Sequence, residues 1–260
     1  MIKKVLTAVN DFDMLHEDDR VIVCISGGKD SLTLLHLLRH TQKVSPKKFQ
    51  LAAATVDPQT PEYNPAPLKE YMQHLGVPYF YESHAIVSLA AEKMTKKISL
   101  CAFCSRMKRG ILYSCARREG YNVLALGQHL DDLAESFMMS IFNNGALRTM
   151  KANYVNDKGD LRIIRPLVYV RERMTKSFAE DAKLPIINEN CPACFAAPTE
   201  RHRMKLLLAS QEQVFPDVFS SVLKAIIPIM KGNSEVELGK RLRDEEDKEE
   251  DCEECVFNPV

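Results

Sequence analysis

The fold is decided by residues 21–31, which read Val21-Ile-Val-Cys-Ile-Ser-Gly-Gly-Lys-Asp-Ser31. The start of this stretch is a short apolar run, which predicts a buried strand, and residues 31–40 follow with a helical pattern. The glycines let the backbone come close to an anion, and the start of a helix supplies free N–H groups and a partial positive charge. We therefore expect a phosphate site at the end of the strand. The residues predicted to bind the phosphate are Ser26, Gly27, Gly28, Lys29, Asp30 and Ser31.

This loop matches neither of two common phosphate-binding patterns. A Walker A loop needs Gly-x-x-x-x-Gly-Lys, and a dinucleotide fingerprint needs Gly-x-Gly-x-x-Gly. Alternatively, the same sequence pattern could be a glycine-rich turn with a capping serine, which binds no ligand. The Lys-Asp-Ser that follows the glycines instead resembles the pyrophosphatase loop of the ATP-α-hydrolase (PP-loop) superfamily. That resemblance implies ATP as the ligand, cleaved between its α and β phosphates.

Short apolar runs alternate with helical patterns along the rest of the chain. Further strands are expected at 51–56, 78–82, 123–126 and 186–187, with a hairpin over 151–165. Helices are expected at 68–75, 105–119, 131–142 and 171–183, and from 199 onward. This alternation predicts an α/β fold, with a parallel sheet that carries helices on both faces. The resemblance to the PP-loop superfamily implies that the sheet is Rossmann-like (HUP-type). The phosphate loop would lie at the carboxyl edge of that sheet, where open α/β sheets bind ligands.

Composition divides the chain into a body and a tail. Residues 233–260 carry eleven acidic and four basic side chains and almost no apolar ones, so we expect a disordered acidic tail. Residues 1–232 are expected to form one PP-loop domain, whose net charge of +7 suits an anionic partner such as nucleic acid. The apolar runs are too short to span a bilayer and the first residues lack a secretion signal, which predicts a cytoplasmic protein.

Acidic residues follow two of the expected strands. Asp57 comes directly after the strand at 51–56, and Gly127-Gln-His-Leu-Asp-Asp132 follows the strand at 123–126. Both places would share the sheet edge of the phosphate loop. There Asp57, Asp131 and Asp132 could hold a divalent ion such as Mg²⁺ on the phosphates, or handle a proton. Alternatively, Asp131 or Asp132 only caps the following helix.

Six of the eight cysteines form three Cys-x-x-Cys pairs, namely Cys101/Cys104, Cys191/Cys194 and Cys252/Cys255. Without a secretion signal, such pairs favour metal, cluster or redox chemistry over a disulfide framework. Four thiolates from the first two pairs would suit a structural zinc site, whereas three would suit an iron–sulfur cluster with one open iron. The spacing alone does not separate these two sites.

Five motifs follow one another between residues 21 and 200. They are Ser26-Gly-Gly-Lys-Asp-Ser31, Cys101-x-x-Cys-Ser-Arg-x-x-Arg-Gly-Ile-Leu-Tyr113, Ala125-Leu-Gly-x-His-x-Asp-Asp132, Ile164-Arg-Pro-Leu167 and Cys191-x-x-Cys194. In this order they resemble the tRNA 2-thiocytidine biosynthesis proteins, which thiolate a cytidine in the tRNA anticodon loop. The resemblance implies an ATP-dependent tRNA sulfurtransferase that adenylates the C2 carbonyl of a cytidine and replaces its oxygen with sulfur.

The resemblance also implies a cluster and its ligands. By this likeness Cys101, Cys104 and Cys194 bind a 4Fe–4S cluster whose fourth iron is free to carry sulfur, and Cys191 binds no metal. It further implies that Mg²⁺ accompanies ATP. The partners it implies are tRNA and a sulfur donor such as a cysteine desulfurase persulfide, with no membrane, and a homodimer is one of the oligomeric states left open.

Roles in the reaction are implied in the same way. Analogy with related tRNA thiolation enzymes gives Asp57, Lys108 and Asp131 the tasks of orienting the substrate and handling protons or charge. Nucleotide contacts fall to Gly127 and His129. Basic residues on three segments would hold the phosphates of tRNA. These are Arg106, Lys108, Arg109, Arg117 and Arg118; Arg162, Arg165, Arg171 and Arg173; and Arg201, Arg203 and Lys205.

Two other classes of protein remain open. One is a different PP-loop ligase, which thiolates tRNA uridine or forms an amide. The other is a non-catalytic, zinc-stabilised RNA-binding module, against which the intact phosphate loop argues.

Overall fold

The computed structural model describes residues 1–60, 63–93, 100–187 and 199–232, without the side chains of 91–93 and 101. Within this part of the chain, six strands form one sheet in the order β3-β2-β1-β4-β6-β5. The strands are β1 (Asp19–Cys24), β2 (Phe49–Asp57), β3 (Tyr79–Ser83), β4 (Val123–Ala125), β5 (Asn153–Val155) and β6 (Arg162–Ile164). Neighbouring strands are parallel except β5 and β6, which form the expected hairpin. The predicted parallel α/β sheet is therefore confirmed.

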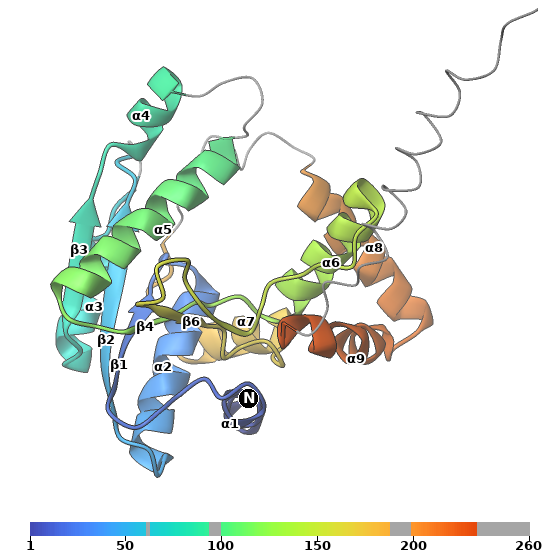
Figure 1. Ribbon diagram of the computed structural model, residues 1–260, viewed down its shortest axis with the longest axis horizontal. Coiled ribbons are helices and arrows are strands. Elements are labelled where there is room, and N and C mark those ends of the chain that lie inside the picture. The colour runs from blue at the N-terminus through green and yellow to red at the C-terminus, as the bar shows by residue number, and fades with distance from the viewer. Residues whose placement is uncertain (61–62, 94–99, 188–198, 233–260) are drawn as a thin grey trace, which may run out of the picture.

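Helices cover both faces of the sheet (Figure 1). They are α1 (Ile2–Asp11), α2 (Lys29–Val44), α3 (Ala66–Leu75), α4 (Ile86–Lys93), α5 (Leu100–Arg118), α6 (Leu130–Asn144), α7 (Glu172–Asp181), α8 (Glu200–Val214) and α9 (Val218–Met230). Successive residues of β1 point to opposite faces, as the pleat requires. Val21 and Val23 pack in the larger core with α1 and α2, while Ile22 packs with Ala116 of α5 in the smaller one.

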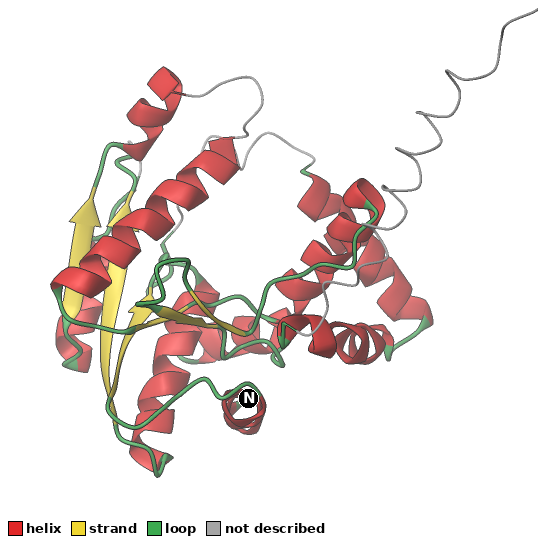
Figure 2. Cartoon of the chain, viewed as in Figure 1, coloured by secondary structure: helices red, strands yellow, loops and turns green. Residues whose placement is uncertain are grey.

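Helices α6, α8 and α9 contact one another beside the sheet (Figure 2). Residues 199–232 are helical as expected, but within this range they form two helices rather than one. Both α8 and α9 send apolar side chains, among them Leu208 and Ile226, into the larger core. None of the helices in the described ranges is long and apolar enough to cross a membrane.

Four local features differ from the sequence-based expectations. Helices α1 and α4 were not predicted, although the buried residues Val5, Ala8 and Val9 of α1 follow helical spacing. Helix α5 begins at Leu100, so its first turns contain the first cysteine pair, which was expected to precede the helix. The strand predicted at 186–187 is wrong. The backbone N–H of Ile187 instead donates to the carbonyl of Gly27 at 3.0 Å, which takes this segment across the phosphate loop and not into the sheet.

Candidate active site

The loop between β1 and α2 is held by its own serines. The Ser31 hydroxyl donates to the Gly28 carbonyl at 2.9 Å and accepts from the Ser26 N–H at 3.2 Å. The Gly28 N–H donates to the Ser26 hydroxyl at 3.3 Å. Because Gly28 is the N-cap of α2, these contacts hold the loop at the positive end of that helix. The geometry is that of an anion site.

Two glycines allow neighbouring backbone to approach this loop. Gly27 has a φ of +92°, and a Cβ placed there would lie 2.3 Å from Cγ1 of Ile187. A Cβ on Gly127 would lie 3.1 Å from the backbone N and Cα of Ser31. Side chains at these positions would separate the loop from the chain on either side of it. The predicted residues of the phosphate loop and Gly127 are thus adjacent.

Lys29 forms two ion pairs at the start of α2. Its Nζ lies 3.0 Å from Oδ2 of Asp30 and 3.0 Å from Oε1 of Glu172, the first residue of α7. Burial would lower the pKa of Lys29, but the two carboxylates raise it above its usual range. The other oxygen of Asp30 accepts a 2.5 Å hydrogen bond from Thr175. Lys29 therefore stays positively charged, and α7 is fastened to the phosphate loop.

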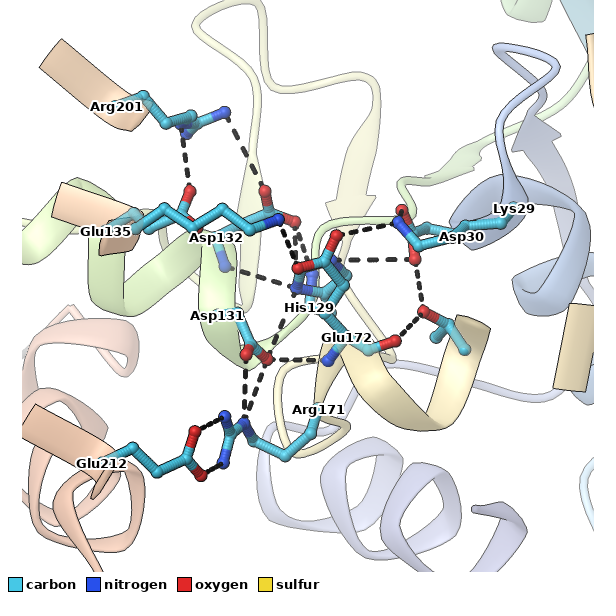
Figure 3. A network of polar contacts seen from close by, with 12 residues as sticks. Lys29, Asp30, His129, Asp131, Asp132, Glu135, Arg171, Glu172, Arg201 and Glu212 are labelled. Carbon is cyan, nitrogen blue, oxygen red and sulfur yellow. Dashed lines mark hydrogen bonds and ion pairs between the residues drawn. The ribbon is translucent and has the colours of Figure 1, made fainter. Parts of the chain in front are cut away.

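His129 is the N-cap of α6 and is 4% exposed. Its Nδ1 accepts from the Asp132 N–H at 3.3 Å, and the Asp132 carboxylate accepts from the His129 N–H at 3.0 Å. This reciprocal capping box explains Asp132 as a helix-capping residue, though the N-cap itself is the histidine. Nε2 of His129 lies 3.7 Å from Asp30, so the two predicted nucleotide segments meet here (Figure 3).

Asp131 is committed to protein contacts. Its carboxylate accepts from Nε of Arg171 at 3.1 Å and from the backbone N–H of Glu172 at 2.7 Å. Arg171 also donates two hydrogen bonds, of 2.6 and 2.9 Å, to the carboxylate of Glu212 on α8. Its guanidinium carbon lies 3.3 Å from the ring centroid of Phe219. Figure 3 shows this chain of contacts from α6 through the start of α7 to α8. It positions α7 rather than leaving Asp131 open to a ligand.

Asp57 ends β2 at the same edge of the sheet and is 8% exposed. One carboxylate oxygen accepts from the Gln59 N–H at 2.7 Å, and the other accepts from the hydroxyl of Tyr81. Burial and the nearby carboxylate raise the pKa of Tyr81 to about 12. Asp57 therefore sits as an acceptor beside a neutral hydroxyl that keeps its proton.

Helix α5 carries the first cysteine pair and Lys108. Positions 101, 104 and 108 are three and four residues apart, so they follow one face of the helix. Among the described residues, no group of three or more His, Cys, Asp or Glu side chains could hold a metal ion. Cys191, Cys194 and the tail pair lie outside the described residues.

Most residues of the predicted basic surface pair with carboxylates of the protein itself. Arg117 binds Asp160 at 2.6 Å, and Arg118 binds Glu82 at 2.5 Å. Within the described part of the chain, neither Arg106 nor Arg109 of α5 forms an ion pair. Sequence reasoning missed the carboxylates of α6, α7 and α8 as members of the site. These carboxylates are Glu135, Glu172 and Glu212. They pair with residues far away in the sequence, so no local sequence pattern marks them.

Comparison with known proteins gives three findings. Residues 1–205 match the PP-loop domain family. The tRNA-cytidine(32) 2-sulfurtransferases of Geobacter sulfurreducens and Pelobacter propionicus are 39% and 41% identical to this chain over 219 residues, which make up 84% of this chain and 85% and 81% of those proteins. Among solved structures, the U34-tRNA thiolase NcsA from Methanococcus maripaludis with its 4Fe–4S cluster has a TM-score of 0.71 and 21% identity, covering 88% of this chain and 78% of that chain. At that identity the likeness concerns the fold.

Proposed function

Because this chain belongs to the PP-loop domain family and to the tRNA-cytidine(32) 2-sulfurtransferases, we propose that it is an ATP-dependent tRNA sulfurtransferase acting on a cytidine of the anticodon loop. One structural observation carries the proposal. The serine- and glycine-rich loop stands at the amino end of α2, with Lys29 beside it and Gly127 packed against it. This arrangement suits the phosphates of ATP.

The reaction first makes the cytidine oxygen into a leaving group. The C2 carbonyl oxygen attacks the α-phosphorus of ATP, the bond to the β-phosphate oxygen breaks, and pyrophosphate leaves. Hydrosulfide then adds to C2, the C–O bond breaks, and AMP departs with the original oxygen. Loss of the sulfur-bound proton leaves the thiocarbonyl. Splitting one difficult substitution into two easier steps is the general benefit of such an activated intermediate.

The residues of the site would divide the work as follows. The N–H groups at the start of α2 and the Lys29 ammonium bind and neutralise the phosphates. Asp57 and Lys108 would orient the substrate and handle protons or charge at the base. Asp131 acts as a positioning residue, because its oxygens already hold Arg171 and the start of α7. Mg²⁺ would be bound mainly by the phosphate oxygens of ATP and by one or two carboxylates of the protein, as is usual for this ion.

We further propose that Cys101, Cys104 and Cys194 hold a 4Fe–4S cluster. Three thiolates suit a cluster with one open iron, and the amino end of α5 carries partial positive charge that favours thiolates. When bound, the cluster supplies the iron position for sulfide. A cysteine desulfurase persulfide would be the source of that sulfur, in the cytoplasm. A second thiol would attack the inner sulfur of the persulfide, so that a disulfide forms and the outer sulfur leaves as hydrosulfide.

Four single serine variants test this proposal. Cys101, Cys104, Cys191 and Cys194 are each replaced, the proteins are purified without oxygen, and iron, zinc and thiolated tRNA are measured for each. We expect the serine variants of Cys101, Cys104 and Cys194 to lose iron and thiolation together. Cys191→Ser should keep the iron content and the thiolation activity of the parent protein. Cys252→Ser serves as the matched control, since it belongs to another cysteine pair.

Three results would contradict the proposal in different ways. Equal damage in all four variants, with one tightly held zinc and no iron in the parent protein, would establish a structural zinc site instead. Absence of ATP-dependent thiolation in a parent protein that still binds tRNA would favour the RNA-binding module. Thiolation of uridine rather than cytidine would move the protein to the other ligase class.

A further inference from the structure

Glu172 holds two lysines at once. Its Oε1 lies 3.0 Å from Nζ of Lys29, and its Oε2 lies 2.6 Å from Nζ of Lys205 on α8. One carboxylate thus lies between an ammonium group of the phosphate loop and an ammonium group from a distant part of the sequence. The two lysines are close enough to share a single anion.

The Glu172 carboxylate between the two lysines is partly exposed to solvent, and it is negatively charged at neutral pH. The side chains of Lys29 and Glu172 are each 25% exposed, and that of Lys205 is 48% exposed. Burial would raise the pKa of Glu172, but hydrogen bonds from Lys205 and Lys29 lower it to about 2. Glu172 therefore occupies, as an anion, a place where a phosphate group would find the same donors.

We propose that Lys205 is a second pyrophosphate-binding lysine, and that Glu172 is its exchangeable counter-ion, displaced when the β- and γ-phosphates of ATP enter. This inference rests on the proposed ATP-dependent function. A pyrophosphate group carries more negative charge and more acceptor oxygens than one carboxylate, so it competes for both ammonium groups. When pyrophosphate leaves, Glu172 pairs again with the lysines and favours its release.

The competing explanation is an ion pair that only fastens α8 to α7. The two explanations predict opposite signs for one substitution. If Glu172 competes with phosphate, Glu172→Gln removes the competitor and tightens the binding of pyrophosphate. If Glu172 only holds the helices together, Glu172→Gln loosens the site and weakens that binding.

The experiment measures the Kd of inorganic pyrophosphate and of Mg-ATP by calorimetry on the full chain. Lys205→Met should raise the Kd of pyrophosphate about tenfold, the low end for a charged hydrogen bond because the lysine is half exposed. Lys205→Arg should restore binding, and Glu172→Gln should lower the Kd about threefold. Arg203→Met is the matched control, because Arg203 is on the same helix and pairs with Glu200 at 2.9 Å.

The outcomes separate this inference from the proposed function. An unchanged Kd in Lys205→Met, or a raised Kd in Glu172→Gln, overturns the inference while leaving a parent protein that thiolates tRNA. An equal loss in Arg203→Met would show a general effect of charge and also overturn it. A parent protein that binds neither pyrophosphate nor ATP refutes both proposals. If Lys205→Met does not fold, the sign of the Glu172→Gln change decides.

Discussion

Replacing Gly27 with alanine should destabilise the protein by about 2–5 kcal/mol, because two costs add. The φ of +92° is a conformation that alanine avoids, which costs about 1–2 kcal/mol. The new Cβ would also lie 2.3 Å from Cγ1 and 2.9 Å from Cδ1 of Ile187. Relieving that overlap forces the side chain or the segment to move, at about 1–3 kcal/mol. The neighbouring Gly28 has a φ of −78°, which alanine adopts readily. A Cβ added there would have only the Ser26 hydroxyl oxygen within 4 Å, at 3.5 Å. Gly28→Ala is therefore the matched control, with an expected cost of only about 0.5–1 kcal/mol, the preference of an N-cap for glycine over alanine.

Urea unfolding of the two variants, of Ile187→Ala and of the double variant Gly27→Ala/Ile187→Ala measures these costs through the shift in midpoint at constant m. Ile187→Ala removes both clashing carbons. The double variant should therefore be more stable than the sum of the single effects predicts, by about 1–3 kcal/mol, because only the φ cost and the cost of Ile187→Ala itself remain. Equal costs for Gly27→Ala and Gly28→Ala, or simple additivity in the double variant, would refute the argument that Ile187 closes over the loop.

Three further predictions concern the loop, the tail and a buried acid. Lys29→Ala should abolish thiolation while the chain stays folded, because it removes the phosphate-binding ammonium; native-rate thiolation of tRNA would contradict the ATP-loop assignment. Deleting residues 233–260 should leave iron content and thiolation nearly unchanged, because this segment has too little apolar surface to join a core, and loss of activity on replacing Cys252 and Cys255 alone would overturn that view. Burial and the charge of Asp132 raise the pKa of Glu135 to about 7. Since the native state then binds more protons than the unfolded state, stability should fall as pH rises from about 4.5 to 7, by at most about 3 kcal/mol. Glu135→Gln should remove that fall in urea titrations at pH 5 and pH 8, and an identical fall in parent and variant would refute the assignment.

Local sequence patterns were enough to predict the strands, most helices and the phosphate loop. The apolar run of β1 and the loop that follows it are contiguous, so residues close in sequence carry the whole signal. Gly76, which follows the helix predicted over 68–75, adopts a left-handed conformation with φ 63°, which is a local property of a helix end. The missed helix α1 also had its signal in the spacing of its buried residues.

Assignments that depend on distant residues fared differently. The 186–187 pair has the composition of a strand, but its backbone N–H is taken by Gly27. Asp131 was expected to orient the substrate and handle protons or charge, and its carboxylate accepts hydrogen bonds from Arg171 and the Glu172 N–H. Its catalytic role therefore stays a proposal in a modified form, as a positioning residue. The cluster ligands stay a prediction from the resemblance.

The sequence by itself determined that a glycine- and serine-rich loop lies between a buried strand and a helix, and that the chain forms a mostly parallel α/β sheet. Hydrophobic periodicity, glycine placement and helix signals act over a few residues, so they can be read without coordinates. Only the tertiary structure decided which charges share the site. Lys29, Glu172 and Lys205 meet because α2, α7 and α8 pack near one another, and that packing follows from apolar burial in the common core rather than from any pairing motif.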